Sequence, residues 1–193
     1  MSDQTIHDPG PLPRVDDGYQ LVYADPPWAY DDKCHAGKRG AAYKYPCMSL
    51  NALEHMPVED IAADNAVLAM WTTGPMIDNA LWIMDCWDFE YKTVLFTWVK
   101  ETKTGKDSFG LGRHTRSSTE FVLLGVRGYG LKRQSFSVRQ VVHAPVGRHS
   151  AKPPCVRDRL VELYGPDVRR VELFARERTP GWDCWGNQVE GNE

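Results

Sequence analysis

The chain has 193 residues, of which 42% are hydrophobic and 25% are charged, and its formal net charge is −3. This composition is typical of one folded globular domain, and it excludes a disordered chain and a strongly basic protein that binds nucleic acid by charge alone. No apolar run approaches the ~20 residues of a membrane-spanning helix, so a cytoplasmic location is expected. The five cysteines form no CxxC pair, and no metal site is therefore expected.

The basic residues are unevenly distributed along the chain. Residues 33–53 contain four basic side chains and no acidic one, and residues 127–159 contain eight basic side chains against Asp158 alone. Basic loops on a mildly acidic body suit contact with phosphates. Solvated surface loops are an equal alternative, so charge alone does not separate the two interpretations.

Hydrophobic patterning predicts the elements of the first half of the chain. A polar, flexible leader is expected at 1–18, ahead of a single domain at 19–193. The predicted elements, in chain order, are a strand at 20–24, a long loop at 29–48, a weak helix at 49–60, a buried strand at 65–72 and a helix that opens near Pro75. This last helix has one apolar face, because Met76, Ala80 and Met84 recur at four-residue spacing.

The second half continues the alternation of strands and helices. Its predicted elements are strands at 89–99, 119–126 and 138–143, a helix from Pro153 to Tyr164 and a last strand at 170–175, followed by a tryptophan-rich tail. This alternation predicts an α/β fold with a largely parallel sheet, in which ligands bind beyond the carboxyl ends of the strands. Asp25 and Arg176 each follow a predicted strand directly.

The segment Asp25-Pro26-Pro27-Trp28 is the most informative in the chain. The two prolines end the strand and offer carbonyl oxygens on a stiff backbone, while the Asp adds acceptors and the Trp adds a flat apolar face. Such a set suits a planar ring that bears an amino group, for example adenine or cytosine. A proline-stiffened turn with a packed tryptophan is the alternative that these four residues alone leave open.

Three further segments extend this pattern over most of the chain. They are residues 120–128 (EFVLLGVRG), 149–153 (HSAKP) and 172–187, which contain ELFAR and GWDCWGN. With the DPPW segment, in this order and spacing, they make the chain resemble the DPPW-type adenine-N6 methyltransferases. That family uses S-adenosylmethionine, and it includes the catalytic subunit of the eukaryotic messenger-RNA adenine methyltransferase and small bacterial and phage proteins.

The resemblance implies a Rossmann-like methyltransferase fold in circularly permuted order, with a mostly parallel central sheet and helices on both faces. It implies catalysis by Asp25, Pro26, Pro27 and Trp28, in which the Asp contacts the target amino group, Pro26 accepts through its carbonyl and the Trp stacks on the base. The residues implied to bind S-adenosylmethionine are Asp25, Lys152, Arg176, Arg178, Thr179, Asn187 and Gln188. Arg178 and Thr179 depart from the eukaryotic pattern, which has His and Asn there.

The implied partner is nucleic acid, and DNA is favoured over RNA because the short chain is similar to the prokaryotic members. The candidate contacts lie in the loops at 29–48, 100–117 and 128–137. They are Lys33, Lys38, Arg39, Tyr43, Arg113, Arg116, Lys132 and Arg133. The alternatives are an adenine-N6 methyltransferase acting on RNA and a catalytically silent, nucleic-acid-binding subunit of a heterodimer. Association as a homodimer or heterodimer is left open.

The tryptophans are expected to be structural apart from Trp28. Those in or beside apolar runs should pack in the core; they are Trp71, Trp82, Trp87 and Trp98. Trp182 and Trp185 are expected to pack the tail over the last strand. His149 is expected to make a structural hydrogen bond.

Overall fold

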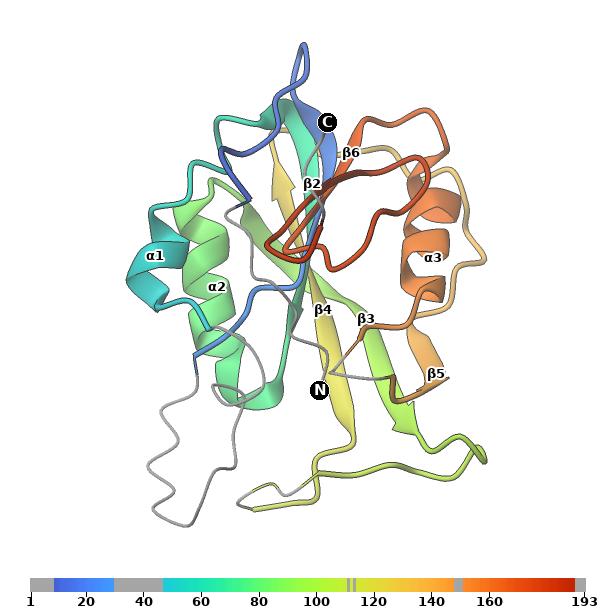
Figure 1. Cartoon of the computed structure of the whole chain (residues 1–193). Helices are drawn as coiled ribbons and strands as arrows, with labels where there is room; N and C mark the ends of the chain where they lie inside the picture. The colour runs from blue at the N-terminus through green and yellow to red at the C-terminus, as the bar shows by residue number, and fades with distance from the viewer. Residues whose placement is uncertain (1–8, 30–46, 111, 113, 148–150, 190–193) are drawn as a thin grey trace.

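A computed structural model describes residues 9–29, 47–110, 112, 114–147 and 151–189. These residues form a sheet of seven strands in the order β5-β3-β4-β2-β1-β6-β7 (Figure 1). The strands are β1 (Tyr19–Ala24), β2 (Ala62–Thr72), β3 (Glu90–Glu101), β4 (Thr119–Arg127), β5 (Val141–Pro145), β6 (Arg170–Leu173) and β7 (Asp183–Trp185). The predicted α/β class is confirmed.

Strand directions give the sheet two different edges. β1 is parallel to both β2 and β6, and β6 is parallel to β7. β4 alone of these strands runs the other way, because it is antiparallel to both of its neighbours, β2 and β3. The carboxyl ends of β1, β2 and β6 therefore meet the amino end of β4 at one edge of the sheet, and ligands of such folds bind at an edge of this kind.

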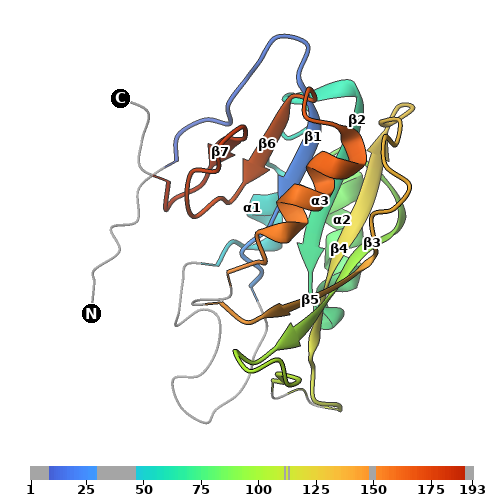
Figure 2. The same cartoon turned by 90° about the vertical axis from the view of Figure 1, so that its right-hand side faces the viewer.

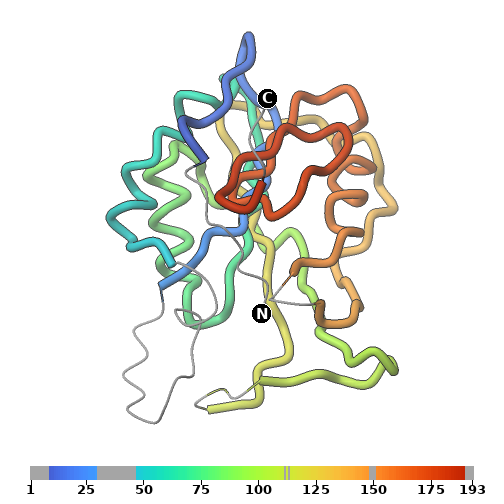
Figure 3. Tube along the Cα trace, in the orientation of Figure 1, coloured from blue at the N-terminus to red at the C-terminus, as the bar shows by residue number. Residues whose placement is uncertain are grey.

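Helices cover both faces of the sheet (Figures 1, 2 and 3). The helices are α1 (Leu50–Glu54), α2 (Ile77–Cys86), which follows a short 3-10 turn η2 (Gly74–Met76), and α3 (Cys155–Tyr164). α1 and α2 enclose one core, which contains Met84 and Trp87, and α3 encloses the other, which contains Leu160. α1 begins where the Ser49 hydroxyl accepts a hydrogen bond from the Ala52 N–H at 3.1 Å. Within the described residues, no helix is long and apolar enough to cross a membrane.

The described part of the expected leader, residues 9–18, contacts the body of the domain. Leu12 and Val15 pack against the core beneath α1 and α2, and the Gly10 carbonyl accepts a hydrogen bond from Trp185 Nε1 at 3.0 Å. Gly18 has φ of 69°, and a Cβ there would lie 2.7 Å from the Ala62 carbonyl carbon. Glycine is therefore required where this segment turns into β1.

Two sequence-based predictions are wrong. The strand predicted at 170–175 is neither that long nor the last, because β6 ends at Leu173, where Phe174 takes a left-handed φ of 63°, and β7 follows it in the tail. Trp82 is 56% exposed rather than packed in the core. It falls between the buried positions of α2, which are Ala80, Ile83 and Met84. Trp71, Trp87 and Trp98 are buried as predicted.

Candidate active site

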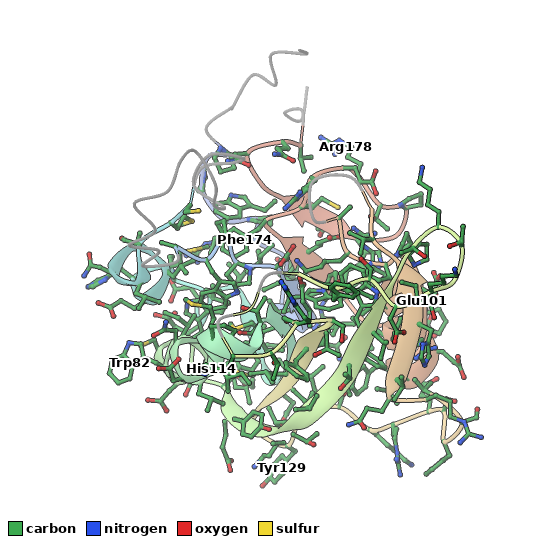
Figure 4. The ribbon with its side chains drawn as sticks, turned by 90° about the horizontal axis from the view of Figure 1, so that it is seen from below. Trp82, Glu101, His114, Tyr129, Phe174 and Arg178 are labelled. Atoms are coloured by element: carbon green, nitrogen blue, oxygen red, sulfur yellow. The ribbon has the colours of Figure 1, made fainter. Side chains whose placement is uncertain are left out.

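A cavity of about 360 Å³ opens at the edge where β1, β2 and β6 end and β4 begins. Figure 4 views the molecule from below, onto this edge, and shows Phe174 near its centre and Trp82 and Arg178 at the periphery. The lining residues are Pro9, Asp25, Pro26, Pro27, Trp28, Met48, Trp71, Thr72, Thr73, Glu120, Lys152, Phe174, Arg176, Trp185, Gly186, Asn187 and Gln188.

The DPPW segment forms a rigid turn on one wall of this cavity. The Trp28 N–H donates to the Pro26 carbonyl at 2.9 Å, which closes a tight turn, and the Met48 N–H donates to the Pro27 carbonyl at 3.0 Å. Trp28 is only 5% exposed, and its indole N–H donates to the Trp71 carbonyl at 3.2 Å. A carbonyl oxygen has two lone pairs, so the Pro26 oxygen can accept a second hydrogen bond from a ligand.

Acidic and basic side chains alternate in a row that begins in the cavity and continues to Lys100 behind it. Lys152 Nζ lies 2.8 Å from Asp25 Oδ1 and 3.3 Å from Glu120 Oε2. Glu120 Oε1 lies 2.6 Å from the Nζ atom of Lys100 on β3. Asp25 directly follows β1 and Glu120 lies near the start of β4. β2 separates these two strands, so carboxylates from the same edge of the sheet lie on either side of one lysine.

The pKa values of Lys152 and Glu120 depend on both burial and neighbouring charges. Burial alone would lower the pKa of the Lys152 ammonium, but attraction to Asp25 and Glu120 outweighs burial and raises it. Burial alone would raise the pKa of the Glu120 carboxyl, but Lys152 and Lys100 outweigh burial and lower it. Glu120 and Lys152 therefore both carry charge at neutral pH.

A second ion pair is largely buried and is not among the described residues that line the cavity. Arg157 of α3 donates two hydrogen bonds to the Glu172 carboxylate of β6, both at 2.7 Å. Burial raises the pKa of Glu172, and the guanidinium offsets only part of that rise. Trp71 Nε1 donates to the Tyr23 hydroxyl at 2.6 Å in the same interior, and burial raises the pKa of that hydroxyl above its usual range.

The opposite wall is formed by the loop after β6 and by the tail. The Phe174 and Trp185 rings meet edge to face, with centroids 5.6 Å apart, and the Ala175 N–H donates to the Trp185 carbonyl at 2.9 Å. A side chain at Gly186 would collide with the Ala175 carbonyl, so the tail can lie this close only because that residue is glycine. Phe174 holds a left-handed φ of 63°, a costly conformation that is commonest at functional sites.

Most of the site predicted from sequence is brought together by the fold. Eight of those residues line the cavity: Asp25, Pro26, Pro27, Trp28, Lys152, Arg176, Asn187 and Gln188. Arg178 and Thr179 are not among the described residues that line it. Arg178 is exposed, and Thr179 lines a separate surface groove beside α3 and Trp182. The chain turns away from the cavity after Arg176, which separates these residues from their predicted neighbours.

The predicted nucleic-acid contacts are spread over the molecule. Arg116 is exposed in the loop before β4, at the edge that holds the cavity. Lys132 and Arg133 are exposed in the loop after β4, so they lie at the opposite edge of the sheet. Lys33, Lys38, Arg39, Tyr43 and Arg113 lie outside the described residues, and so does His149.

Sequence reasoning missed Glu120, Lys100 and the aromatic wall. Glu120 is 7% exposed, and its signal is a lone carboxylate at the start of the otherwise apolar strand TEFVLLGV. No sequence pattern joins it to Lys100, because the two meet only through the antiparallel pairing of β3 with β4. Trp185 was expected to pack over the last strand. It lies instead in β7, beside β6, where it pairs with Leu173, and its ring contacts Phe174 and adds a wall of the cavity.

Comparison with known proteins gives consistent matches. The chain is 38% identical to the Type II methyltransferase M.MunI from Mycoplasma, over 94% of this chain and 82% of the relative. It is 29% identical to the N(6)-adenine-specific methyltransferase METTL4 of Homo sapiens, over 93% of this chain and 39% of that protein. It is 25% identical to the human N(6)-adenosine-methyltransferase catalytic subunit METTL3, of which it spans 28%.

The fold, the cavity and these matches define the class of protein, a methyltransferase. The family model described as MT-A70 matches residues 19–188. The chain belongs to the MT-A70 family, which confirms the resemblance seen in its motifs.

Proposed function

We propose that the protein transfers a methyl group from S-adenosylmethionine to the N6 amino group of adenine in DNA. The observation that carries this proposal is the DPPW turn on the wall of a cavity, with Asp25 held 2.8 Å from Lys152. The choice of DNA is supported by the 38% identity to a Type II methyltransferase, most of whose length the chain spans.

The residues of the cavity fit the cofactor that MT-A70 methyltransferases generally use. Its volume of about 360 Å³ falls in the range of small-molecule sites. Lys152 and Arg176 are cations suited to the cofactor carboxylate, Asp25 is an acceptor for its amine, and the amides of Asn187 and Gln188 suit ribose and adenine. When bound, S-adenosylmethionine supplies an electrophilic methyl group on a positively charged sulfur.

The DPPW turn is suited to activate an aromatic amino group. The lone pair of such a nitrogen is delocalised into the ring, so the nitrogen is a poor nucleophile. The Asp25 carboxylate and the Pro26 carbonyl would accept hydrogen bonds from the two N–H groups of the amino nitrogen. They would thereby stabilise the positive charge that develops as this nitrogen is methylated. The turn is fixed by backbone hydrogen bonds, so these acceptors are already oriented before the substrate binds.

The position of the cavity sets conditions on the substrate. An adenine in a duplex cannot reach a pocket at the sheet edge while it is stacked, so it would be flipped out of the helix. Arg116, which is exposed just before β4 at this edge, is placed to contact the flanking backbone. We also infer that the strand order is circularly permuted, which is supported by β1 with the catalytic turn coming first and its parallel neighbour β6 coming late in the chain.

A second candidate function is adenine-N6 methylation of RNA. It is supported by a 26% identity to the N6-methyladenosine RNA methyltransferase MTA1 of Cryphonectria parasitica, of which the chain spans 52%. A silent subunit is less well supported, because Asp25, Pro26, Pro27 and Trp28 all stand at the cavity.

These functions are separated by an assay of labelled methyl transfer to three substrates of matched base sequence: duplex DNA, single-stranded DNA and RNA. We expect incorporation into DNA and little or none into RNA. Incorporation into RNA alone would replace the proposal by the second candidate. Cofactor binding without transfer to any of the three would favour the silent subunit.

A further inference from the structure

Lys100 lies near the end of β3 and is not among the described residues that line the cavity. Its ammonium is 2.6 Å from Glu120 Oε1, and its side chain is 24% exposed. Glu120 uses its other oxygen, Oε2, to reach Lys152 at 3.3 Å. Each carboxylate oxygen of Glu120 is thus assigned to a different lysine, one inside the cavity and one behind it.

Two tryptophans support the two lysines. Lys152 Nζ lies 5.5 Å from the centroid of the Trp71 ring, and Lys100 Nζ lies 5.3 Å from that of Trp98. The two rings pack against each other edge to face at 6.1 Å, and both are buried. A cation over an aromatic face is attracted to it, so this platform fixes both ammonium groups and leaves Glu120 between them.

The charges around Glu120 come from four elements. Lys100 is on β3, Lys152 precedes α3, and Asp25 follows β1. Arg176, after β6, faces Lys152 and opposes its charge. Asp25 and Glu120 both compete for Lys152, and Lys100 gives Glu120 a second cation of its own. Without Lys100, Glu120 would depend on Lys152 alone among the ion pairs described.

We propose that Lys100 is a positioning residue for methyl transfer, which holds Glu120 so that Lys152 stays on Asp25. This inference rests on the proposed function of the same cavity. Lys100 acts through Glu120 and touches neither the substrate nor the cofactor. Losing its charge would let Glu120 draw Lys152 from Asp25 and would make the Glu120 carboxylate easier to protonate.

A lysine that only binds a nucleic-acid phosphate from the rim would behave differently. Its loss would raise the KM for nucleic acid and weaken the salt dependence of binding, and it would leave kcat and its pH dependence unchanged. A positioning lysine moves kcat and the pH profile instead. The KM-against-kcat split therefore separates the two roles.

The test compares Lys100→Met, Lys100→Arg and Lys92→Met, the last being a matched control on the same strand, with an exposed lysine that pairs with Glu90. For Lys100→Met we expect the acidic limb of the kcat profile to move up by about one pH unit, which is about a tenfold loss of kcat on that limb. Arginine should restore most of the profile, and Lys92→Met should match the wild type. A Lys100→Met profile that superimposes on the wild type overturns the proposal.

A second measurement does not depend on activity. The pKa of Glu120 is lowered in the folded protein, so its stabilisation is present at neutral pH and is lost as the pH falls through the folded value. The gap in Tm between wild type and Lys100→Met should be widest near neutral pH and should narrow on acidification. In a Glu120→Gln background the Lys100→Met change should have little effect on Tm or kcat, because the partner is gone.

These measurements keep the two proposals apart. A wild-type protein that methylates no nucleic acid contradicts the proposed function, while the Tm comparison still decides the role of Lys100. Equal Tm gaps at all pH values, or additive effects of the two substitutions, contradict the role of Lys100 even where methyl transfer is observed.

Discussion

Two sites in this sheet pair a carboxylate with a basic side chain, but the two pairs have different roles. At the cavity, Lys152 is shared between Asp25 and Glu120 at 2.8 and 3.3 Å. Away from the cavity lining, Arg157 donates two hydrogen bonds of 2.7 Å to the Glu172 carboxylate. A guanidinium fork saturates one carboxylate in a fixed geometry, whereas an ammonium is a compact charge that several partners can share.

This contrast indicates which of the two sites can take part in a reaction. Glu172 is 6% exposed and its carboxylate is already bound in a bidentate geometry, so that pair ties α3 to β6. Asp25 and Lys152 both line the cavity, where a ligand can join their network. We therefore expect changes at the cavity to affect catalysis and changes at the buried pair to affect stability.

The largest expected effect is on catalysis, from Asp25→Asn. Removing one oriented group that stabilises transition-state charge typically costs about 10²–10³-fold in kcat, and we expect at least that loss of methyl transfer. Lys152 keeps Glu120 as a partner, so unfolding free energy should change by about 1 kcal/mol or less. Single-turnover assays and thermal melts measure both. A variant with wild-type kcat would show that Asp25 does not act on the substrate.

The next effect is on stability, from Arg157→Met. The change leaves the Glu172 carboxylate buried and unpaired, which typically costs about 3–5 kcal/mol, or a fall of about 6–20 °C in Tm for a chain of this size. Arg159→Met is the matched control on the same helix, because Arg159 is partly exposed and bonds only to backbone carbonyls among the interactions described. Similar Tm values for the two variants would refute the structural role of the buried pair.

The two glutamates should also differ in the sign of their pH dependence. The pKa of Glu120 is lowered in the folded state, so its contribution is lost as the pH falls, whereas the pKa of Glu172 is raised, so its contribution is lost as the pH rises. Between about pH 7 and pH 4, Glu120→Gln should make Tm decline less steeply than in the wild type, and Glu172→Gln should make it decline more steeply. Parallel curves for all three proteins would show that these shifts are absent.

The smallest effect concerns the basic loops at the two edges of the sheet. Arg116 lies at the edge with the cavity and Arg133 at the opposite edge, where its guanidinium stacks 4.5 Å from the Phe136 centroid. Arg116→Ala should weaken binding to a DNA duplex and reduce the slope of log K against log salt by about 1, as expected for one lost phosphate contact. Arg133→Ala should leave both unchanged, in contrast to the expectation from sequence. The reverse pattern would move the interface to the far edge.

The sequence predicts the parts of the site that lie within one motif. The DPPW turn after β1 and Lys152 before α3 are recognisable because each occupies a short segment with its own residue pattern. The convergence of Lys100 with Glu120 is not, because it depends on the register of two antiparallel strands. Arg178 lies outside the described cavity lining for a related reason, since a matching position in a motif does not say where the chain turns after Arg176.

Three local features were also hard to predict from the sequence: a short strand, the exposure of one tryptophan and a left-handed backbone conformation. The three residues of β7 are too few to show an alternating pattern, and they are recognised as a strand only by their pairing with β6. Trp82 is apolar and lies within a helix, but its position around the helix axis places it outside the packed face. Phe174 gives no sign in the sequence that it adopts a left-handed backbone conformation.

Adenine-N6 methylation at this cavity can be tested by nucleoside mass spectrometry on duplex DNA after incubation with methyl-labelled S-adenosylmethionine. The wild-type protein is expected to produce labelled N6-methyladenine, and the Asp25→Asn protein is expected to produce none above background. Labelled methyl on another base or position, or equal amounts of N6-methyladenine from the two proteins, would contradict adenine-N6 methylation at this cavity.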